Sequence, residues 1–467
     1  MEFIGQHQFS WEDQLWFANL SGDFNPLHVD QHWARRSIAG EPVLHGIHGV
    51  LVALYKVMEK VSSCTIQSIE CSFLEYITIG QMVDFYYVIE ESKLRILIKT
   101  TDRTYTRISC LLGRRKKDNY NVETSIKPRR PPKKQVLDCT FDDLKKNLGI
   151  FFSGFDEIEV SKLYPGLSEK YEPELIGALI NLSALVGMDC PGKNALFKGF
   201  KIRLKNKGQS GNKSKWWVKR AAFPLLVVQI DSDVAEGTVS SFYIENCTDQ
   251  IGMNELTYRV GRHEFAHQRA LIIGGSRGLG ELTAKIIAAG GGRPCITWCH
   301  GQLEALKVSN EIKQSGFYCK QAQLDIDNLD TCISNSGNFG NPTHIYYFAS
   351  PKISARQEYE TYARYYVSSF KKVVLHFLEI SGTRNVFYPS TIFIGQCPKG
   401  LEAYAEAKHQ GELLCENMSE TSEILAFSAR LPKLRTDQNI GLIREDFPDS
   451  ANTMLSHIRE FNSVSQF

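Results

Sequence analysis

A carboxylate and an imidazole lie five positions apart near the start of the chain, as Asp23 and His28. The segment around them contains Gly22, Asn25 and Pro26, residue types that favour turns, so the chain can bend until both side chains point to one spot. A carboxylate and an imidazole that converge can share general acid–base chemistry, such as activating a water and delivering a proton. The alternative interpretation of these two residues alone is a turn that begins at Asp23 and carries a histidine on the surface.

A second set of residues lies in the C-terminal part of the chain. Gly274, Gly278 and Gly280 directly follow the strand-like run at 269–273 and open a helical pattern. Glycines in this context allow a tight turn and let the backbone approach a pyrophosphate, which then sits at the helix N-terminus. The same loop supplies three further candidate cofactor contacts, Ser276, Arg277 and Leu279.

Far downstream, Tyr404 and Lys408 are one helical turn apart, so they share a face of a helix. An ammonium beside a phenol lowers the phenol pKa and can orient a ribose. The tyrosine can then exchange a proton with a substrate oxygen while a hydride moves. Ser390 and Thr391, which follow the strand-like run at 386–388, are candidates for a third member of this group.

The segment from Phe17 to His28, followed by Ala34 and by the pair at 45–46, resembles the hydratase motif of MaoC-like hotdog enzymes. The resemblance implies that Asp23 and His28 share water activation and proton delivery on a 2-enoyl thioester. It implies that Asn25 holds the local geometry. Gly46 would offer its backbone N–H to the thioester oxygen at the start of an apolar helix.

The glycine loop together with Tyr404 and Lys408 looks like the cofactor loop and catalytic pair of short-chain dehydrogenases. That resemblance implies an adenine contact for Asp325 and a segment closing over the nicotinamide that includes Thr436. Family members have a serine about thirteen residues before the tyrosine, a spacing that selects Thr391, whereas Ser390 has the usual residue type.

The chain also departs from the dehydrogenase pattern. An asparagine on the helix before the tyrosine is missing, and Ser368 is nearest in register. The run Phe348-Ala349-Ser350 replaces the usual Asn-Ala-Gly, and Lys433 replaces a glycine. These departures put full activity of this half in doubt.

The cofactor preference follows from charge. Enzymes that use NAD place an acidic residue after the second strand, but the segment 299–302, which contains the candidate contact His300, offers none. Arg277 in the glycine loop can pair with a 2′-phosphate. We therefore expect NADP(H) in preference to NAD(H), and no metal.

The elements that must position these residues form a predictable order. The first segment, 1–115, contains one long apolar helical run and then alternating strand-like runs, and the segment 136–264 repeats that order without the hydratase motif. A basic, proline-containing stretch at 116–135 reads as a linker, and strands alternate with helices over 265–467. The expected fold is an α+β double hotdog, with a degenerate second half, followed by an α/β Rossmann-like, doubly wound parallel sheet.

The bulk composition narrows the class of protein. The chain has 467 residues, 43% of them hydrophobic, and a formal net charge of +2, which gives no reason to expect a nucleic-acid partner. No secretory signal and no long apolar run are visible, and the twelve cysteines are scattered, so we expect reduced thiols, no membrane association and a cytoplasmic location. Both families commonly self-associate, and the resemblance implies a homodimer.

Taken together, these patterns predict a bifunctional enzyme that acts on acyl-CoA or acyl carrier protein thioesters. One half would be an (R)-3-hydroxyacyl dehydratase or 2-enoyl hydratase, and the other an NADP(H)-dependent 3-oxoacyl reductase or 3-hydroxyacyl dehydrogenase. One alternative is a hydratase with an inactive or regulatory cofactor-binding domain, and another is a scaffold without activity. Acyl chain length, carrier and physiological direction stay open.

Overall fold

The computed structural model describes residues 1–61, 64–114, 135–205, 214–245, 250–329, 339–354, 357–439 and 441–465. The chain divides into two compact units, Met1–Asn246 with Gly441–Arg444, and Cys247–Ile440 with Glu445–Phe467. Apart from residue 135, the basic linker expected at 116–135 lies outside the described residues. The two units are considered separately below.

Ten strands of the described chain form one antiparallel sheet in the first unit, in the order β1-β3-β4-β5-β2-β7-β10-β9-β8-β6. The strands are β1 (Glu2–Gln8), β2 (Cys64–Phe73), β3 (Met82–Glu90), β4 (Lys93–Lys99), β5 (Thr104–Arg114), β6 (Leu148–Ile150), β7 (Ala195–Leu204), β8 (Lys215–Ala222), β9 (Leu225–Asp231) and β10 (Ala235–Tyr243).

This sheet consists of two halves with the same topology. The order β1-β3-β4-β5-β2 of the first half returns, reversed across the sheet, as β6-β8-β9-β10-β7 in the second. The halves join where β2 pairs with β7, with Ile69 opposite Ile202 and Cys71 opposite Phe200. The repeated order of helix first and strands after, seen in the sequence, therefore corresponds to a repeated supersecondary unit.

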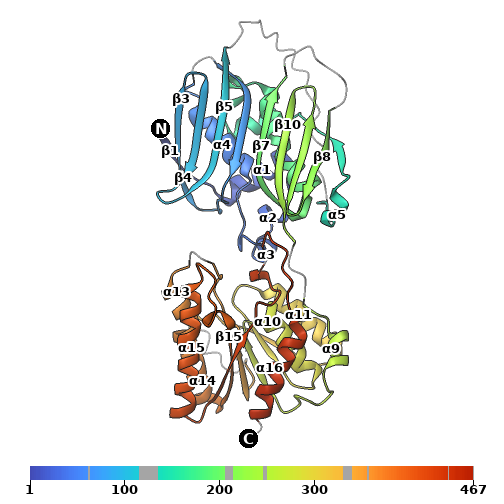
Figure 1. Cartoon of the computed structure of the whole chain (residues 1–467), viewed down its shortest axis with the longest axis vertical. Helices are drawn as coiled ribbons and strands as arrows, with labels where there is room; N and C mark the ends of the chain where they lie inside the picture. Colours follow the sequence, from blue (N-terminus) through green and yellow to red (C-terminus); the bar gives the residue numbers. More distant parts are fainter. Residues whose placement is uncertain are drawn as a thin grey trace. The chain divides into compact units, whose positions relative to one another are not determined.

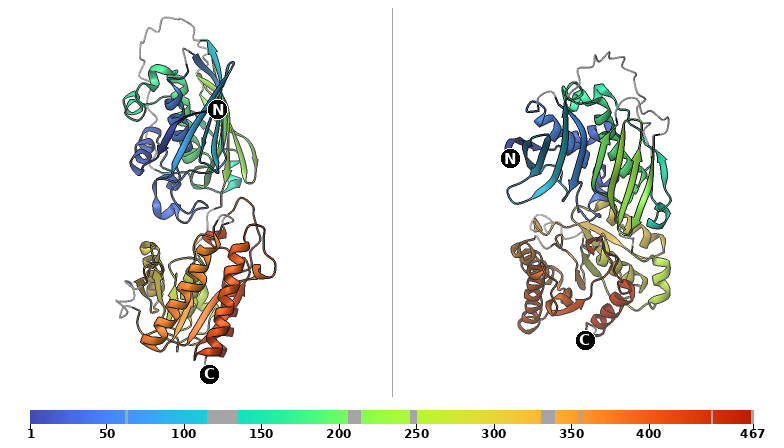
Figure 2. Two further views of the ribbon diagram at one scale, coloured as in Figure 1. Left: turned by 90° about the vertical axis from the view of Figure 1, so that its left-hand side faces the viewer. Right: turned by 45° about the horizontal axis from the view of Figure 1, so that its top comes forward.

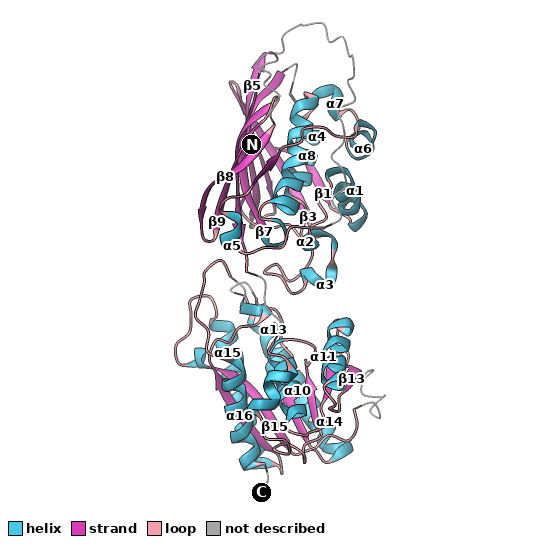
Figure 3. Cartoon of the chain, turned by 90° about the vertical axis from the view of Figure 1, so that its right-hand side faces the viewer, coloured by secondary structure: helices cyan, strands magenta, loops and turns pink. Residues whose placement is uncertain are grey.

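Each half places one long apolar helix against the sheet, α4 (Gly46–Val57) in the first half and α8 (Pro173–Ala184) in the second. Both helices are buried on nearly all sides, as expected for helices that lack a polar face. Figures 2 and 3 show the helices gathered on one face of the sheet. The remaining helices of this unit are α1 (Trp11–Ser21), α2 (Pro26–Val29), α3 (Gln31–Ala34), α5 (Phe141–Leu144), α6 (Glu157–Leu163), α7 (Leu167–Lys170), η1 (Leu185–Asp189) and η2 (Gly192–Asn194).

The second unit is built on a parallel sheet in which six described strands follow the order β13-β12-β11-β14-β15-β16. The strands are β11 (Ala270–Ile273), β12 (Cys295–Trp298), β13 (Lys320–Gln323), β14 (His344–Tyr347), β15 (Asn385–Thr391) and β16 (Leu425–Leu431). The helices are α9 (Met253–Arg259), α10 (Gly278–Ala289), α11 (Gln302–Gln314), α13 (Tyr359–Ala363), η4 (Arg364–Ser369), α14 (Phe370–Ser381), η5 (Ile392–Ile394), α15 (Glu402–Thr421), η6 (Asp437–Asn439) and α16 (Ser450–Val464).

Helices cover both faces of the parallel sheet. In β11, Ile272 faces a core built with α10 and α16, while Leu271 and Ile273 face a core built with α14 and α15. Figure 1 shows α14 and α15 on one side of β15 and α10 on the other. A strand covered on both faces is apolar without alternation, as the fully buried run of β11 shows.

The second unit begins earlier than the expected boundary at residue 264. Met253 and Leu256 of α9, and Val260 after it, are buried in the same core as α10. Apolar residues at helical spacing thus assign this segment to the second unit. Within the described part of the chain, no helix combines the length and the apolar character needed to cross a membrane.

Candidate active sites

The loop that carries Asp23 and His28 is fixed at both ends by local hydrogen bonds. Helix α1 ends at Gly22, which adopts the left-handed conformation (φ 73°) that favours glycine. Asn25 caps α2 by accepting a hydrogen bond from the Leu27 N–H at 2.9 Å, and Pro26 occupies the first helical position. The turn formers seen in the sequence thus produce a bend with Asp23 at its start and His28 one helical turn beyond Asn25.

Asp23 is buried and holds its carboxylate in a polar pocket. Its Oδ2 accepts a hydrogen bond from Ser183 Oγ at 2.7 Å, and its Oδ1 accepts one from the Asn25 N–H at 3.2 Å. Hydrogen bonds to a carboxylate favour its charged form and fix its orientation.

His28 and His45 lie next to this carboxylate. Atoms of Asp23, His28 and His45 that could bind a proton or a metal all lie within 4.8 Å of one another. The two imidazoles stack with ring centroids 4.0 Å apart. The structure therefore brings Asp23 and His28 together as the sequence led us to expect, and adds His45 as a third member.

The hydrogen bonds of the two imidazoles define their tautomers. His28 Nδ1 lies 2.8 Å from the Val43 carbonyl, and His45 Nε2 lies 3.0 Å from the Asp23 carbonyl. A carbonyl only accepts, so these nitrogens carry the protons, and in neutral His28 the lone pair is on Nε2. Burial, and then the neighbouring His28, lowers the pKa of His45 well below its ordinary value, so His45 is neutral.

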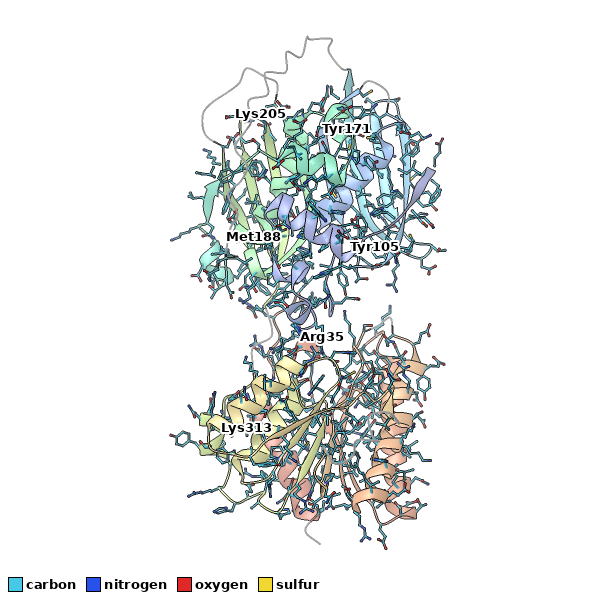
Figure 4. The ribbon with its side chains drawn as sticks, turned by 180° about the vertical axis from the view of Figure 1, so that it is seen from behind. Arg35, Tyr105, Tyr171, Met188, Lys205 and Lys313 are labelled. Atoms are coloured by element: carbon cyan, nitrogen blue, oxygen red, sulfur yellow. The ribbon has the colours of Figure 1, made fainter. Side chains whose placement is uncertain are left out.

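The second half of the first unit clamps this loop from the other side. Asn25 Nδ2 donates to the carbonyls of Gly187 at 3.0 Å and Gly192 at 2.8 Å, and the Phe24 N–H points to Met188 Sδ at 3.2 Å. Met188, labelled in Figure 4, belongs to the π-helical turn η1 that follows α8. A π-turn inside or after an α-helix is a frequent feature of functional sites.

Gly187 makes this approach possible. A Cβ atom at this position would lie 2.0 Å from Asp23 Oδ1 and 2.6 Å from Asp23 Cγ, far inside van der Waals contact. Gly46, the first residue of α4, is similarly tight, since a Cβ there would lie 2.7 Å from the ring of Phe73. The N–H of Gly46 is at the helix terminus and so has no partner within the helix, as an oxyanion donor requires.

Among the described residues, Asp23, His28 and His45 are also the group that could hold a metal ion by residue type. One ring nitrogen of each histidine already makes a hydrogen bond to the backbone. His28 Nδ1 and His45 Nε2 are engaged with backbone carbonyls, and the stacked rings lie side by side. A metal ion bound by this group would have to use the other nitrogen of each ring, His28 Nε2 and His45 Nδ1, together with Asp23.

In the second unit, the glycine loop runs from the end of β11 into α10. Gly274 and Gly278 have positive φ values of 79° and 60°, and a Cβ on Gly280 would lie 2.3 Å from the Gly274 carbonyl oxygen. Thr297 of β12 anchors the loop, accepting from the Gly274 N–H at its hydroxyl and from the Gly275 N–H at its carbonyl. Each of these glycines is therefore required by the turn itself.

The other expected cofactor residues surround this loop. Arg277 pairs with Asp437 at 3.3 Å, and Thr436 lies against Gly278. Ser276 Oγ would lie 3.2 Å from a Cβ on Gly301, next to the exposed His300, while Leu279 packs against the core behind the loop.

Asp325 caps the turn after β13. It accepts hydrogen bonds from Asn328 Nδ2 at 2.8 Å and from the Asp327 N–H at 3.0 Å. Burial opposes the charge of this carboxylate, but those hydrogen bonds prevail and lower its pKa. These hydrogen bonds give Asp325 a structural role in the turn after β13. Its contact with an adenine stays a prediction.

Tyr404 and Lys408 point from α15 toward the end of β15. Thr391 is hydrogen-bonded to Tyr404, whereas Ser390 faces Glu412, so the structure places the threonine in the position selected by spacing. Burial raises the pKa of Tyr404 to about 12, and the Thr391 hydrogen bond opposes that rise. Lys408 Nζ donates to the Pro389 carbonyl at 2.6 Å, and burial lowers its pKa to about 7.

Comparison with known families supports the resemblance drawn for the first unit. Residues 6–109 match the family model described as MaoC like domain, which confirms the resemblance drawn from the segment around Asp23 and His28. No curated protein matches the chain.

Similar solved structures include several reductases. FolM alternative dihydrofolate reductase 1 from Brucella canis, complexed with NADP, is 14% identical, with a TM-score of 0.37, covering 44% of this chain and 91% of its own. A short-chain dehydrogenase from Burkholderia cenocepacia, also with NADP, is 19% identical, with a TM-score of 0.33, covering 38% and 78%. The landomycin C-6 ketoreductase LanV with bound NADP and rabelomycin is 14% identical, with a TM-score of 0.31, covering 37% and 77%. At these identities and TM-scores, the function proposed below has to rest on the geometry of the sites.

Besides His45, three residues gain a place in the sites that the sequence did not give them. Ser183 lies in α8 and Gly187 in η1, and the hydrogen bond from Ser183 to Asp23 spans 160 positions of the chain. Tyr366 covers Lys408, where the sequence pointed to Ser368 as the nearest residue in register. The signal in the sequence was the missing asparagine on this helix. It did not indicate which side chain lies next to Lys408.

Proposed function

We propose that the chain is a two-site enzyme acting on acyl thioesters, an (R)-specific 2-enoyl hydratase or 3-hydroxyacyl dehydratase in a double hotdog and an NADP(H)-dependent 3-oxoacyl reductase or 3-hydroxyacyl dehydrogenase in a doubly wound unit. The observation that carries the proposal is the convergence of Asp23 and His28 within 4.8 Å on a loop clamped by the second half. The two reactions are consecutive on a 3-hydroxyacyl thioester, which gives one chain a reason to carry both.

In hydration, the oxygen of a water adds to the β-carbon and the α-carbon takes up a proton. The Asp23 carboxylate and the His28 Nε2 lone pair hold the water, accept a proton from it and return a proton to the α-carbon. The Gly46 N–H donates to the thioester oxygen as negative charge develops there. His45 and Ser183 touch Asp23 and act by keeping it in place. Dehydration uses the same groups in reverse.

In reduction, the residues of the glycine loop would hold the dinucleotide, which would supply the hydride for the carbonyl carbon. Tyr404 donates its phenolic proton to the carbonyl oxygen, with Thr391 hydrogen-bonded beside it. A tyrosine whose pKa is raised to about 12 is protonated at neutral pH, as a proton donor must be. Lys408, one turn along the same helix, supplies positive charge when it is protonated.

The residues around the glycine loop fit a phosphorylated dinucleotide. The positive φ values and close contacts of the loop leave its backbone open to a pyrophosphate at the start of α10. Arg277, which pairs with Asp437 at 3.3 Å, supplies a cation in the glycine loop that suits a 2′-phosphate, and the segment 299–302 contains no carboxylate that would repel that phosphate. This supports NADP(H) in preference to NAD(H).

The test uses the whole chain with crotonyl-CoA and NADP⁺. Hydration consumes the conjugated double bond, and oxidation of the 3-hydroxybutyryl-CoA then yields acetoacetyl-CoA, NADPH and a proton. We expect loss of the enoyl absorbance followed by the appearance of NADPH. Absence of hydration with both CoA and acyl carrier protein thioesters would overturn the proposal.

A second candidate function is a hydratase whose cofactor-binding unit has no activity. The enclosure of Lys408, which is 6% exposed and donates to the Pro389 carbonyl, favours it. Hydration that proceeds without NADPH formation, together with no oxidation of NADPH by acetoacetyl-CoA, would support this candidate.

A further inference from the structure

The side chain of Lys408 in the second unit is enclosed by aromatic rings. Its Nζ lies 3.9 Å from the centroid of the Tyr366 ring and 4.9 Å from that of Tyr388. The same Nζ donates to the Pro389 carbonyl at 2.6 Å. An ammonium over an aromatic face is attracted by the ring quadrupole, and the attraction is stronger when the charge is desolvated. The rings therefore stabilise one position of this charge.

Tyr366 is itself held in place from several sides. Its hydroxyl lies 2.6 Å from Ser350 Oγ, and its backbone carbonyl accepts from Tyr388 Oη at 3.3 Å. Its ring stacks on that of Tyr362 with an angle of 7° between planes, and meets the ring of Tyr404 edge to face at 5.8 Å. Tyr366 is 1% exposed.

The location of Tyr366 explains how the ring reaches the lysine. It lies in the π-helical segment η4, between α13 and α14, and such a segment shifts side chains relative to an α-helix. Ser350 comes from the segment after β14. Two positions at which the sequence departs from the dehydrogenase pattern, the residue after Phe348-Ala349 and the helix before the tyrosine, thus contact each other.

We propose that Tyr366 is the positioning residue of Lys408: its ring face holds the ammonium against the Pro389 carbonyl, and packing against the rings of Tyr362 and Tyr404 keeps that ring in place. The proposal rests on the oxidoreductase function proposed above and specifies how the lysine of that site is held. The ring face and the Pro389 carbonyl take the place of water around the charge, so the ammonium is held in an enclosed position.

The charges and titratable groups that face Lys408 are few. Glu412 and Cys415 lie on its own helix, Tyr388 comes from β15, and Tyr366 comes from η4. Burial lowers the pKa of Lys408 to about 7, with Cys415 and Glu412 opposing the shift. Below that pH the ammonium is present, and above it the charge is lost. A substitution that replaces the Tyr366 ring with an aliphatic side chain removes an attraction for the ammonium and should move this titration to lower pH.

The first arm of the test is independent of turnover. Protein labelled with ¹³C at the lysine ε-carbon is compared as wild type, Y366F and Y366L, and the Lys408 signal is identified by its loss in K408R. Protons over a ring face are shifted upfield, so we expect an upfield signal in wild type and Y366F and its return toward the other lysines in Y366L. An unshifted Lys408 signal in the wild type overturns the proposal without reference to any variant.

The second arm measures NADPH oxidation by acetoacetyl-CoA from pH 6 to pH 9. We expect kcat to fall about tenfold in Y366L and to change less than about twofold in Y366F, since the conservative variant keeps the ring face. The pH limb near 7 should move downward in Y366L, because the ring face that favours the ammonium is lost, and should stay in Y366F. Equal pH profiles in all three proteins overturn the proposal. A third outcome is that the Lys408 signals behave as expected but the protein reduces no 3-oxoacyl thioester. That outcome would overturn the oxidoreductase function and leave the positioning of Lys408 supported.

Discussion

In the first unit, the acid–base pair sits on a loop whose partners come from residues about 160 positions later, Ser183 and Gly187 among them. In the second unit, Tyr404 and Lys408 share one helix, and Thr391 and Pro389 come from the strand just before it. The first site is therefore assembled across two halves of a repeated topology, and the second is assembled within one strand–helix unit. A half that lacks a motif of its own can still be required by the site of the other half.

The largest effect should come from Asp23→Asn, which keeps the shape of the side chain and removes its charge. We expect hydration of crotonyl-CoA to fall about a thousandfold, in the range of lost general acid–base catalysis. Reduction of acetoacetyl-CoA should be unchanged, because that chemistry belongs to the other unit. Asp30→Asn, which alters the cap of α3, is the matched control. Equal loss of both activities would break the separation of the two sites.

Tyr404→Phe should produce the mirror-image result. Removing the phenolic proton donor should lower NADPH-dependent reduction about a hundredfold, again by loss of proton transfer. Hydration measured by enoyl absorbance should be unaffected. The exposed Tyr359→Phe on α13 serves as the control. Reduction that survives in Tyr404→Phe would remove the tyrosine from the mechanism.

Ser183→Ala tests the contribution of the second half directly. A hydrogen bond to a charged group contributes about 1.5–3 kcal/mol, so kcat for hydration should fall at least about tenfold. The fall should appear in kcat more than in KM, because Ser183 contacts Asp23. Ser240→Ala on β10, a half-buried hydroxyl of the same half, is the control. An unchanged kcat would reduce the second half to a packing role.

Arg277→Ala tests the cofactor preference. Loss of a charge-assisted contact with the 2′-phosphate should weaken NADPH binding about tenfold, while NADH binding changes little. Fluorescence titration with both nucleotides provides the comparison, and the exposed Arg262→Ala is the control. Equal weakening for NADPH and NADH would point to a general role of Arg277 in the glycine loop, such as its pairing with Asp437.

The smallest effect is expected when metal ions are removed from the protein. Incubation with EDTA and re-assay should leave hydration unchanged, because the stacked His28 and His45 are occupied with backbone carbonyls. Activity that is lost with EDTA and restored by Zn²⁺ would show that Asp23, His28 and His45 act as ligands instead.

Short-range patterns made part of this architecture predictable. Turn formers around Asp23, the glycine loop and the pair Tyr404–Lys408 are local in sequence, and each lies where its spacing led us to expect. The match of residues 6–109 to a MaoC-like domain confirms the family resemblance of the first part.

The rest depended on contacts between distant segments. The hydrogen bond from Ser183 to Asp23 and the close fit of Gly187 against Asp23 result from the packing of the two halves. No periodicity in the sequence indicates which residues of the two halves meet. Similarly, the absence of an asparagine near Ser368 gave no indication that the ring of Tyr366 lies over Lys408. The assignment of α9 to the second unit also required its packing against α10.

The claim that one chain carries two separate active sites is tested most directly by mixing variants. Asp23→Asn and Tyr404→Phe are each incubated with crotonyl-CoA and NADP⁺, alone and together, while NADPH is followed. We predict no NADPH from either variant alone and recovery in the mixture, because 3-hydroxybutyryl-CoA made by one protein reaches the other. A mixture that stays inactive, or NADPH from Asp23→Asn alone, would contradict this account.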